Sequence, residues 1–512
     1  MGVLVKPLLP YSGPYPVSTT DLELPLPQPR SFDALSLKSK REPALRLETV
    51  LFTLYYPAGG DDEPESQSGS GLHQPWVQRP IEQTAQGYAA FLGQREDLCR
   101  GLFRYAGEAL ALPAEADRPL AAHTGPNQGA AQTGSASLDR SAPGDTPRAS
   151  DAWPLIVFSH GMSGQRTTYS RWCGEMASRG YIVAAVEHRD GSGPISIVRL
   201  GGGQEREVPF LRPEELCWSE GSGDVDLLDF RAVQQQIRLS EVAAALAVLR
   251  RLNEGEGDPV ARENRRKDLG GEGVAGRYLP DWKGRIDFND VTVAGHSFGG
   301  GTTLEALRVG MPFFPFTKGI ALDPSADPLP PDRARTVFSA LRHDLAKAKD
   351  GAAAKSAESD AAAERSNDTD SAGEQPQIDV PLLIVNSESF TLWNKRFEEI
   401  KTAFNSLGEG VRGWLMTLVG SSHSSFSDVF LVVPFATKLV GQRASASLVL
   451  DRTVQACLEF LQERHDDGPI LTQSIISGDE AGGRPNEADK GWFGQRNGMQ
   501  GEPGSMRMHL KR

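Results

Sequence analysis

The segment of residues 291–300 (VTVAGHSFGG) constrains the fold of this chain more than any other, because it reads as a strand, a sharp turn and a helix start. A short β-branched run ends at Ala294, and a Gly-x-Ser-x-Gly turn centred on Ser297 follows it. In such turns the serine adopts a strained backbone conformation, and flanking glycines let strand and helix approach closely. The alternative is a glycine-rich connection with an ordinary serine. The apolar strand before the turn and the helical pattern at 302–308 favour a displayed nucleophile.

The length of 512 residues suffices for one large α/β domain with insertions or for two domains. The cysteines are far apart and have no C-x-x-C spacing, which predicts free thiols in a reducing compartment. They are Cys99, Cys173, Cys217 and Cys457. The apolar N-terminus is broken by Lys6 and several prolines, which is atypical of a signal peptide, and no apolar stretch approaches 18 residues. We therefore expect a cytoplasmic protein without a transmembrane helix.

The charge balance argues against a nucleic-acid partner. There are 54 Lys and Arg residues against 67 Asp and Glu residues, a formal net charge of −13. Binding to phosphate backbones relies on clustered basic side chains. We interpret the excess of acidic residues as a solvated surface.

Three polar segments lack the apolar residues needed for a packed core: residues 113–151, residues 346–377 and the C-terminal residues 477–512. We expect the first two to be low-complexity insertions and the third to be a flexible tail. A fourth stretch, residues 254–284, is charged and glycine-rich, and is expected to loop out before the serine-bearing strand. Residues 1–476 are then predicted to form a single domain that carries the insertions.

Short apolar runs without alternation recur along the chain and are typical of strands buried on both faces of a mostly parallel sheet. They lie at 50–55, 155–158, 181–186, 291–294, 320–322, 382–385 and 415–419. Between two of them, Leu239, Val242, Leu246 and Leu249 form an apolar stripe at helical spacing. Strands that alternate with helices predict an α/β protein in which helices flank a mostly parallel central sheet.

A serine hydroxyl becomes a nucleophile when a histidine accepts its proton and an acid orients that histidine. In the α/β-hydrolase fold the chain order is serine, acid and histidine, with the last two on loops after strands. Asp323 directly follows the run at 320–322, and His423 follows the run at 415–419. The rivals are Asp327, further from its strand end, and His343, which no strand precedes. We favour Ser297, Asp323 and His423 as the catalytic residues.

An oxyanion hole requires two backbone N–H groups that point at the developing negative charge. One is expected from Phe298, the residue after the serine. The second is expected from the loop after an early strand. The segment of residues 155–162 (LIVFSHGM) has that form, with the amide of Met162 as the donor. The alternative is that His160 and Gly161 form an ordinary turn.

These segments resemble the platelet-activating factor acetylhydrolases of the plasma and intracellular type II class. The similar pieces are FSHGM at 158–162 with RTTYS at 166–170, GYIVAAVEHRD at 180–190, GHSFGG at 295–300, GIALD at 319–323 and GSSH at 420–423. Parts of the N-terminal 60 residues are also similar, so the resemblance covers most of the chain outside the insertions. The insertions indicate a divergent, fungal-like member.

The resemblance implies calcium-independent hydrolysis of the short sn-2 acyl ester of platelet-activating factor or of oxidised phospholipids, without a cofactor. Carried over by position, Ser297 is the nucleophile, Asp323 the orienting acid and His423 the general base. The amides of Phe298 and Met162 form the oxyanion hole. After Asp323 the chain reads PSAD where the family often has a tryptophan, which implies a differently shaped acyl pocket. The alternatives are a general carboxylesterase or lipase, and a non-catalytic binding protein with the same fold.

Two apolar segments, residues 311–316 (MPFFPF) and 426–435 (FSDVFLVVPF), lie close in sequence to the predicted site. They could meet a lipid surface peripherally, but core packing is favoured because apolar residues are mostly buried. No metal site is predicted. His188 and Asp190 lie close together at a strand end, where one imidazole beside a carboxylate is more often structural.

Overall fold

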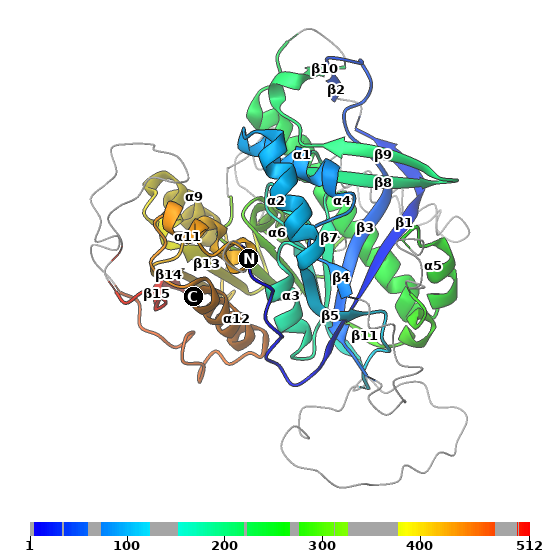
Figure 1. Cartoon of the computed structure of the whole chain (residues 1–512). Coiled ribbons are helices and arrows are strands. Elements are labelled where there is room, and N and C mark those ends of the chain that lie inside the picture. The colour runs from blue at the N-terminus through cyan, green and yellow to red at the C-terminus, as the bar shows by residue number, and fades with distance from the viewer. Residues whose placement is uncertain are drawn as a thin grey trace, which may run out of the picture.

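An eleven-stranded sheet forms the centre of the molecule (Figure 1). The computed structural model describes residues 5–32, 35–59, 73–122, 152–219, 223–266, 276–311, 313–325, 377–476, 499 and 501–512. Among these residues, the strand order is β15-β14-β13-β12-β11-β6-β7-β3-β1-β5-β4. The strands are β1 Val17–Ser31, β3 Arg46–Pro57, β4 His73–Pro75, β5 Ala111–Ala116, β6 Trp153–Ser159, β7 Ile182–Glu187, β11 Ile286–His296, β12 Lys318–Leu322, β13 Leu382–Ser387, β14 Gly413–Leu418 and β15 Met506–Lys511. Two further pairs are β2 Leu35–Leu37 with β10 Leu216–Trp218, and β8 Ile195–Gly201 with β9 Gln204–Pro209.

The six neighbouring strands from β14 to β7 are parallel, while β15 and β3 pair antiparallel at the two sides of this group. Each of the seven predicted apolar runs falls in a strand of the sheet, to within one residue. Along β6, Leu155 and Val157 belong to one hydrophobic cluster, and Ile156 and Phe158 belong to the other. Both faces of the sheet are therefore buried, which is why these strands lack a polar alternation. The expected mostly parallel sheet is confirmed.

Helices cover both faces of the sheet. The cluster on one face includes residues of α4, α6 and α9, and the cluster on the other includes residues of α3 and α12. The predicted stripe at 239–249 lies in α4 and is buried. The helices are α1 Ile81–Leu92, α2 Glu96–Ala109, α3 Ser170–Ala177, α4 Leu227–Glu254, α5 Gly257–Glu263, α6 Phe298–Val309, α8 Glu388–Thr391, α9 Asn394–Asn405, α10 Val429–Val432, α11 Ala436–Leu439 and α12 Ala446–Leu461. This is the α/β-hydrolase arrangement, with the central parallel strands between two helical layers.

Two of the segments expected to be irregular contribute strands. The end of the predicted tail, residues 477–512, forms β15, which pairs antiparallel with β14 and buries Met506 and Met508. The start of the predicted insertion at 113–151 lies in β5. The prediction overlooked β15 because basic residues alternate with its apolar ones, a pattern that an edge strand tolerates. The stretch 254–284 likewise contains α5 and a short 3-10 helix, Leu279–Trp282.

We propose one domain for the described residues, because β1 near the N-terminus and β15 at the C-terminus belong to the same sheet. The domain then extends beyond residue 476. Residues 123–151 and 326–376, which include most of both predicted insertions, lie outside the described residues. In the part of the chain that is described, no helix combines the length and apolar character needed to span a bilayer. All four cysteines are free, as predicted.

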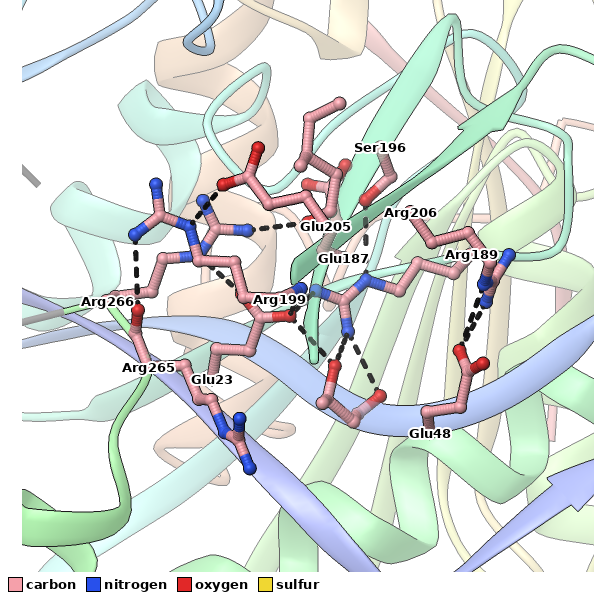
Figure 2. A network of polar contacts seen from close by, with 12 residues as sticks. Glu23, Glu48, Glu187, Arg189, Ser196, Arg199, Glu205, Arg206, Arg265 and Arg266 are labelled. Atoms are coloured by element: carbon pink, nitrogen blue, oxygen red, sulfur yellow. Dashed lines mark hydrogen bonds and ion pairs between the residues drawn. The ribbon is translucent and has the colours of Figure 1, made fainter. Parts of the chain in front are cut away.

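Glu23 on β1 lies within a buried ion network beside β8 and β9 (Figure 2). Its carboxylate is 2.6 Å from Arg189 Nη2 and 2.6 Å from Arg266 Nε. It also accepts hydrogen bonds from Thr49 Oγ1 at 2.8 Å and from the Arg199 backbone N–H at 3.0 Å. Burial acts to raise the pKa of Glu23, but the two guanidinium groups and the hydrogen bonds from Arg199 and Thr49 together hold that pKa below its usual value. The network joins the N-terminal strand to segments about 165 and 240 residues further along the chain.

The substitution Glu23→Gln is expected to destabilise the fold, because it leaves Arg189 and Arg266 buried without their shared counter-charge. Breaking a buried ion pair on one side costs about 3–5 kcal/mol of unfolding free energy. Urea denaturation followed by circular dichroism measures the loss. The exposed Glu42 provides a matched control, and Glu42→Gln should change the free energy by less than about 0.5 kcal/mol. An equal effect of both substitutions would contradict a stabilising role of the network.

Candidate active site

The turn between β11 and α6 displays Ser297 in a strained conformation. Ser297 has φ 57° and ψ −120°, in the left-handed half of backbone space that residues other than glycine rarely occupy. A Cβ at Gly295 would lie 2.2 Å from the carbonyl oxygen of Gly299, and one at Gly299 would lie 2.0 Å from that of Ser159. Only glycine fits at either position without movement of the backbone. The spacing of the Gly-x-Ser-x-Gly turn thus follows from the close approach of β6, β11 and α6.

Ser297, His423 and Asp323 form a continuous hydrogen-bonded series. His423 Nε2 is 2.8 Å from Ser297 Oγ, and His423 Nδ1 is 2.7 Å from Asp323 Oδ2. Asp323 directly follows β12, and His423 begins a short 3-10 helix, His423–Phe426, after β14. The three residues are 3 %, 5 % and 0 % exposed, in the order serine, histidine, acid. The strand ends of the parallel sheet thus bring the three predicted side chains together although 126 residues separate the serine from the histidine.

Three residues at and just beyond the end of β13 support this series and were not predicted from the sequence. The backbone N–H of Ser387 donates to Asp323 Oδ1 at 2.9 Å, and the Ser387 hydroxyl donates to Asp323 Oδ2. Ser389 Oγ accepts from the backbone N–H of His423 at 3.0 Å. The ring of Phe390 stacks on the imidazole of His423 at a centroid distance of 4.1 Å. These residues follow the apolar run at 382–385, so the strand-end argument that located Asp323 also places them at this edge of the sheet, although it does not give their contacts.

Burial has opposite effects on the two ionisable members of the series. It lowers the pKa of His423, and the positive charge of Arg396 lowers it further, which keeps the imidazole neutral and able to accept a proton. Burial raises the pKa of Asp323 to about 7, and the hydrogen bonds from Ser387 act against this rise. The donors from Ser387 and His423 all point at the oxygen atoms of Asp323, which favours the carboxylate. The arrangement therefore holds a neutral base between a hydroxyl and a carboxylate.

The loop after β6 packs directly against the serine. A Cβ at Gly161 would lie 2.9 Å from the Cβ of Ser297. The carbonyl oxygen of Gly161 accepts from Gly164 N–H at 3.1 Å and lies 2.8 Å from His160 Nδ1. Because the C=O of Gly161 and the N–H of Met162 belong to one trans peptide, they point in opposite directions. Holding the carbonyl therefore also sets the direction of the Met162 N–H, the proposed oxyanion donor.

The other proposed donor, Phe298 N–H, lies in the first turn of α6, where backbone N–H groups have no partner within the helix.

Each side chain of the 188–190 segment has a protein partner. His188 bonds Glu241 Oε2 at 2.6 Å and Ser159 Oγ at 2.7 Å through its two ring nitrogens. Asp190 forms a buried ion pair with Arg238 at 2.6 Å, and Arg189 belongs to the Glu23 network. These contacts join the end of β7 to α4 and to the end of β6, where the loop of residues 160–164 begins; we call it the oxyanion loop after its proposed role. They agree with a structural interpretation of this segment.

Among the described residues, one group has donor atoms close enough to share an ion, namely His296, Asp323 and His423, within 4.8 Å of one another. All four ring nitrogens already have partners. Those of His296 bond Tyr169 Oη and the carbonyl oxygen of His423, and those of His423 bond Asp323 and Ser297. An ion would have to displace these hydrogen bonds, so the donor set does not fit a metal.

The two apolar segments near the site are mostly packed in the core. In the first, Phe314 and Phe316 are buried while Met311 is exposed. In the second, Phe426, Phe430 and Val432 are buried while Phe435 is 46 % exposed. Asp428 fixes the second segment, because its carboxylate accepts from the Ser170 and Arg171 N–H groups at the start of α3. The rival catalytic residues, Asp327 and His343, lie outside the described residues.

Comparison with known proteins identifies a family and several similar proteins. Residues 130–341 match the model of a family described as platelet-activating factor acetylhydrolase, isoform II. The platelet-activating factor acetylhydrolase of Gallus gallus is 25 % identical over 81 % of this chain and 78 % of that protein. The protein of the same name from Cavia porcellus is 26 % identical over 88 % of this chain and 76 % of that protein. A solved ferulic acid esterase from Streptomyces cinnamoneus aligns with 92 % of this chain and 96 % of its own, with a TM-score of 0.45 and 18 % identity.

Proposed function

Because this chain belongs to the platelet-activating factor acetylhydrolase family as a divergent member, and is thus an ester hydrolase, we propose a specific reaction for it. It hydrolyses the short sn-2 acyl ester of platelet-activating factor or of oxidised phospholipids. The products are a lysophospholipid and a short carboxylic acid. The observation that carries the proposal is the series Ser297–His423–Asp323, with both hydrogen bonds formed.

The proposed reaction begins when His423 Nε2 takes the proton of Ser297 Oγ and the oxygen attacks the sn-2 carbonyl carbon. Asp323 stabilises the imidazolium that forms, and the N–H groups of Phe298 and Met162 bind the oxyanion. When the tetrahedral intermediate collapses, the bond between the acyl carbon and the sn-2 oxygen breaks. His423 gives its proton to that oxygen, and the lysophospholipid leaves.

Hydrolysis of the acyl-enzyme completes the cycle. His423 takes a proton from water, and the hydroxide oxygen bonds to the acyl carbon. Ser297 Oγ leaves, recovers the proton from His423, and the short acid is released. No step needs an ion or cofactor, which fits the full use of the ring nitrogens by protein partners.

The surroundings of the serine support a small acyl group. Ser297 is 3 % exposed, and the segment after Asp323 is packed tightly against α6. A Cβ at Gly300 would lie 2.9 Å from Pro324 Cα, and Ser325 N–H donates to the carbonyl oxygen of Ser297 at 2.9 Å. Pro324 and Ser325, the described part of the PSAD sequence that departs from the family pattern, are thus held against the nucleophile helix. We propose that these two residues shape the acyl pocket in place of the tryptophan.

A series of phosphatidylcholines with sn-2 chains from acetyl to palmitoyl tests the substrate assignment. We expect kcat/KM to fall by at least about 100-fold across the series, because each added methylene must be accommodated beside an enclosed serine. A long chain shortened by oxidation and ended by an aldehyde should regain activity, and EDTA should have no effect. Equal rates across the series would instead identify a general carboxylesterase.

We also propose where in the cell the protein acts and that it contacts lipid surfaces. A phospholipid substrate resides in membranes or lipid particles, so the protein is expected to meet lipid surfaces peripherally. The four free thiols support a reducing, cytoplasmic location.

A further inference from the structure

A line of three hydrogen bonds connects the oxyanion loop to the loop that carries the catalytic histidine. Gly161 N–H donates to Tyr169 Oη at 3.1 Å. Tyr169 Oη is 2.8 Å from His296 Nδ1, and His296 Nε2 is 2.9 Å from the backbone carbonyl oxygen of His423. The line passes beneath Ser297, because His296 is the residue immediately before it. It therefore joins the loops after β6, β11 and β14 without involving the catalytic side chains.

Elementary donor and acceptor rules determine the direction of every bond in this line. The carbonyl oxygen of His423 can only accept, so His296 Nε2 carries a proton and donates it. Burial and the neighbouring His423 lower the pKa of His296 to about 3, so the ring is neutral and Nδ1 has no proton. The Tyr169 hydroxyl must then donate to Nδ1, while its oxygen accepts from Gly161 N–H, which can only donate. No other assignment of donors and acceptors satisfies all three hydrogen bonds.

The line is enclosed by rings and closed to solvent. Tyr169 and His296 are each 4 % exposed. The ring of His296 lies 4.7 Å from that of His423 and 5.5 Å from that of Phe426, and the ring of Tyr169 lies 5.0 Å from that of Phe158. Loss of one member would leave a buried polar group without a partner, which is energetically unfavourable. The neighbouring rings leave the line little freedom to rearrange.

We propose that Tyr169 and His296 are positioning residues that hold the oxyanion loop and the His423 loop at a fixed separation across Ser297. Tyr169 holds the N–H of Gly161, and the contacts of the Gly161 carbonyl oxygen hold the other side of that residue. Together they set the direction of the Met162 N–H. His296 holds the backbone of His423, which maintains the distance from His423 Nε2 to Ser297 Oγ. The inference rests on the proposed function, because it assigns a role in the same reaction.

Tyr169→Phe removes a single oxygen atom and so tests this line of hydrogen bonds, which we call the bridge. We expect kcat for a short-chain ester to fall by about 10- to 100-fold with KM within twofold, because small displacements of reacting groups have effects of that size. Tyr56→Phe is the matched control, since Tyr56 is also buried and its hydroxyl donates to the Arg118 carbonyl oxygen at 2.8 Å on another part of the sheet. The control should keep kcat within twofold while losing similar thermal stability. An unchanged kcat in Tyr169→Phe would overturn the proposal.

Two substitutions at His296 separate the halves of the bridge. In His296→Gln the amide can replace the Nε2 donor to His423 but leaves Tyr169 without an acceptor, and in His296→Asn the amide can replace the acceptor for Tyr169 but not the donor. If Tyr169 and His296 act as one unit, kcat of the double variant Tyr169→Phe/His296→Gln should fall no further than in the more affected single variant. If the fold-reductions in kcat of the two single variants instead multiply, the two residues act separately, which would overturn the bridge.

A readout independent of turnover separates failure of the bridge from failure of the proposed function. The proton shared by His423 Nδ1 and Asp323 is expected to give a far-downfield proton NMR signal, which Asp323→Asn should remove. In Tyr169→Phe that signal should shift or broaden, whereas in Tyr56→Phe it should not. An unchanged signal in Tyr169→Phe would refute the bridge even in an active enzyme. A wild-type protein without esterase activity, but with a signal that responds to Tyr169→Phe, would refute only the proposed function.

Discussion

Ser297→Ala is expected to reduce kcat by about 10⁵- to 10⁶-fold, the scale on which loss of a triad nucleophile acts in serine hydrolases. The Ser297 hydroxyl, 2.8 Å from His423 Nε2, is the proposed acyl acceptor, and an alanine side chain supplies no acceptor in its place. Steady-state hydrolysis of a short-chain ester measures the loss. A fluorophosphonate probe supplies the second measurement. Mass spectrometry should find its adduct on the peptide that contains Ser297 in the wild-type protein and nowhere in the variant.

Ser424→Ala provides the matched control for this experiment, because Ser424 lies one residue beyond His423 and its loss leaves the series intact. The control should remain active within about twofold and should be labelled at Ser297, as expected for a substitution outside the site. Both variants should unfold at similar temperatures. Esterase activity retained in Ser297→Ala, or an adduct on a different serine, would show that the nucleophile lies elsewhere.

Asp323→Asn is expected to lower kcat by about 10⁴-fold, as loss of the orienting carboxylate does in serine proteases. The reason lies in the tautomer of His423. Asp323 Oδ2 accepts the proton on Nδ1 and leaves Nε2 free to accept from the serine. An amide –NH2 in that place would donate to Nδ1 instead, so the ring proton would move to Nε2 and face Ser297. The two donors of Ser387 would also lose part of the negative charge that they now meet.

The size of this loss distinguishes Asp323 from its rival in sequence. Asp327→Asn should leave kcat within twofold if Asp323 is the orienting acid. Ser387→Ala should give an intermediate loss of about tenfold, because it removes one hydrogen bond to the carboxylate and leaves the backbone donor in place. A large loss in Asp327→Asn together with a small one in Asp323→Asn would reverse the assignment.

The elements that could be predicted from the sequence are those whose signal is local. Continuous apolar runs mark the parallel strands because those strands are buried on both faces. For the same reason, β15 was missed, since an edge strand keeps polar residues among its apolar ones. Asp323 and His423 could be proposed because the loops that follow parallel strands meet at one edge of the sheet. Residues that directly follow parallel strands in the sequence can therefore be placed near one another in space.

The supporting contacts could not be predicted in this way. Tyr169 bonds a histidine 127 residues further along the chain, and nothing in the RTTYS sequence distinguishes its hydroxyl from that of any other buried tyrosine. Ser387 and Ser389 follow a predicted strand, yet their roles depend on a carboxylate and a backbone amide from two other strands. Hydrogen bonds between distant segments depend on ångström-scale placement, which spacing along one chain does not encode.

The amino-acid sequence by itself determined seven strands of the central sheet, the apolar stripe of α4, the position of the serine turn and the candidate residues at the strand ends, because periodicity and glycine placement act over a few residues. The tertiary structure alone decided that a neutral imidazole lies between Ser297 and Asp323, which proton each histidine carries, and which buried charges are paired. Those properties depend on burial and on partners from remote segments, since the energy of a charge or a hydrogen bond is set by its surroundings in space.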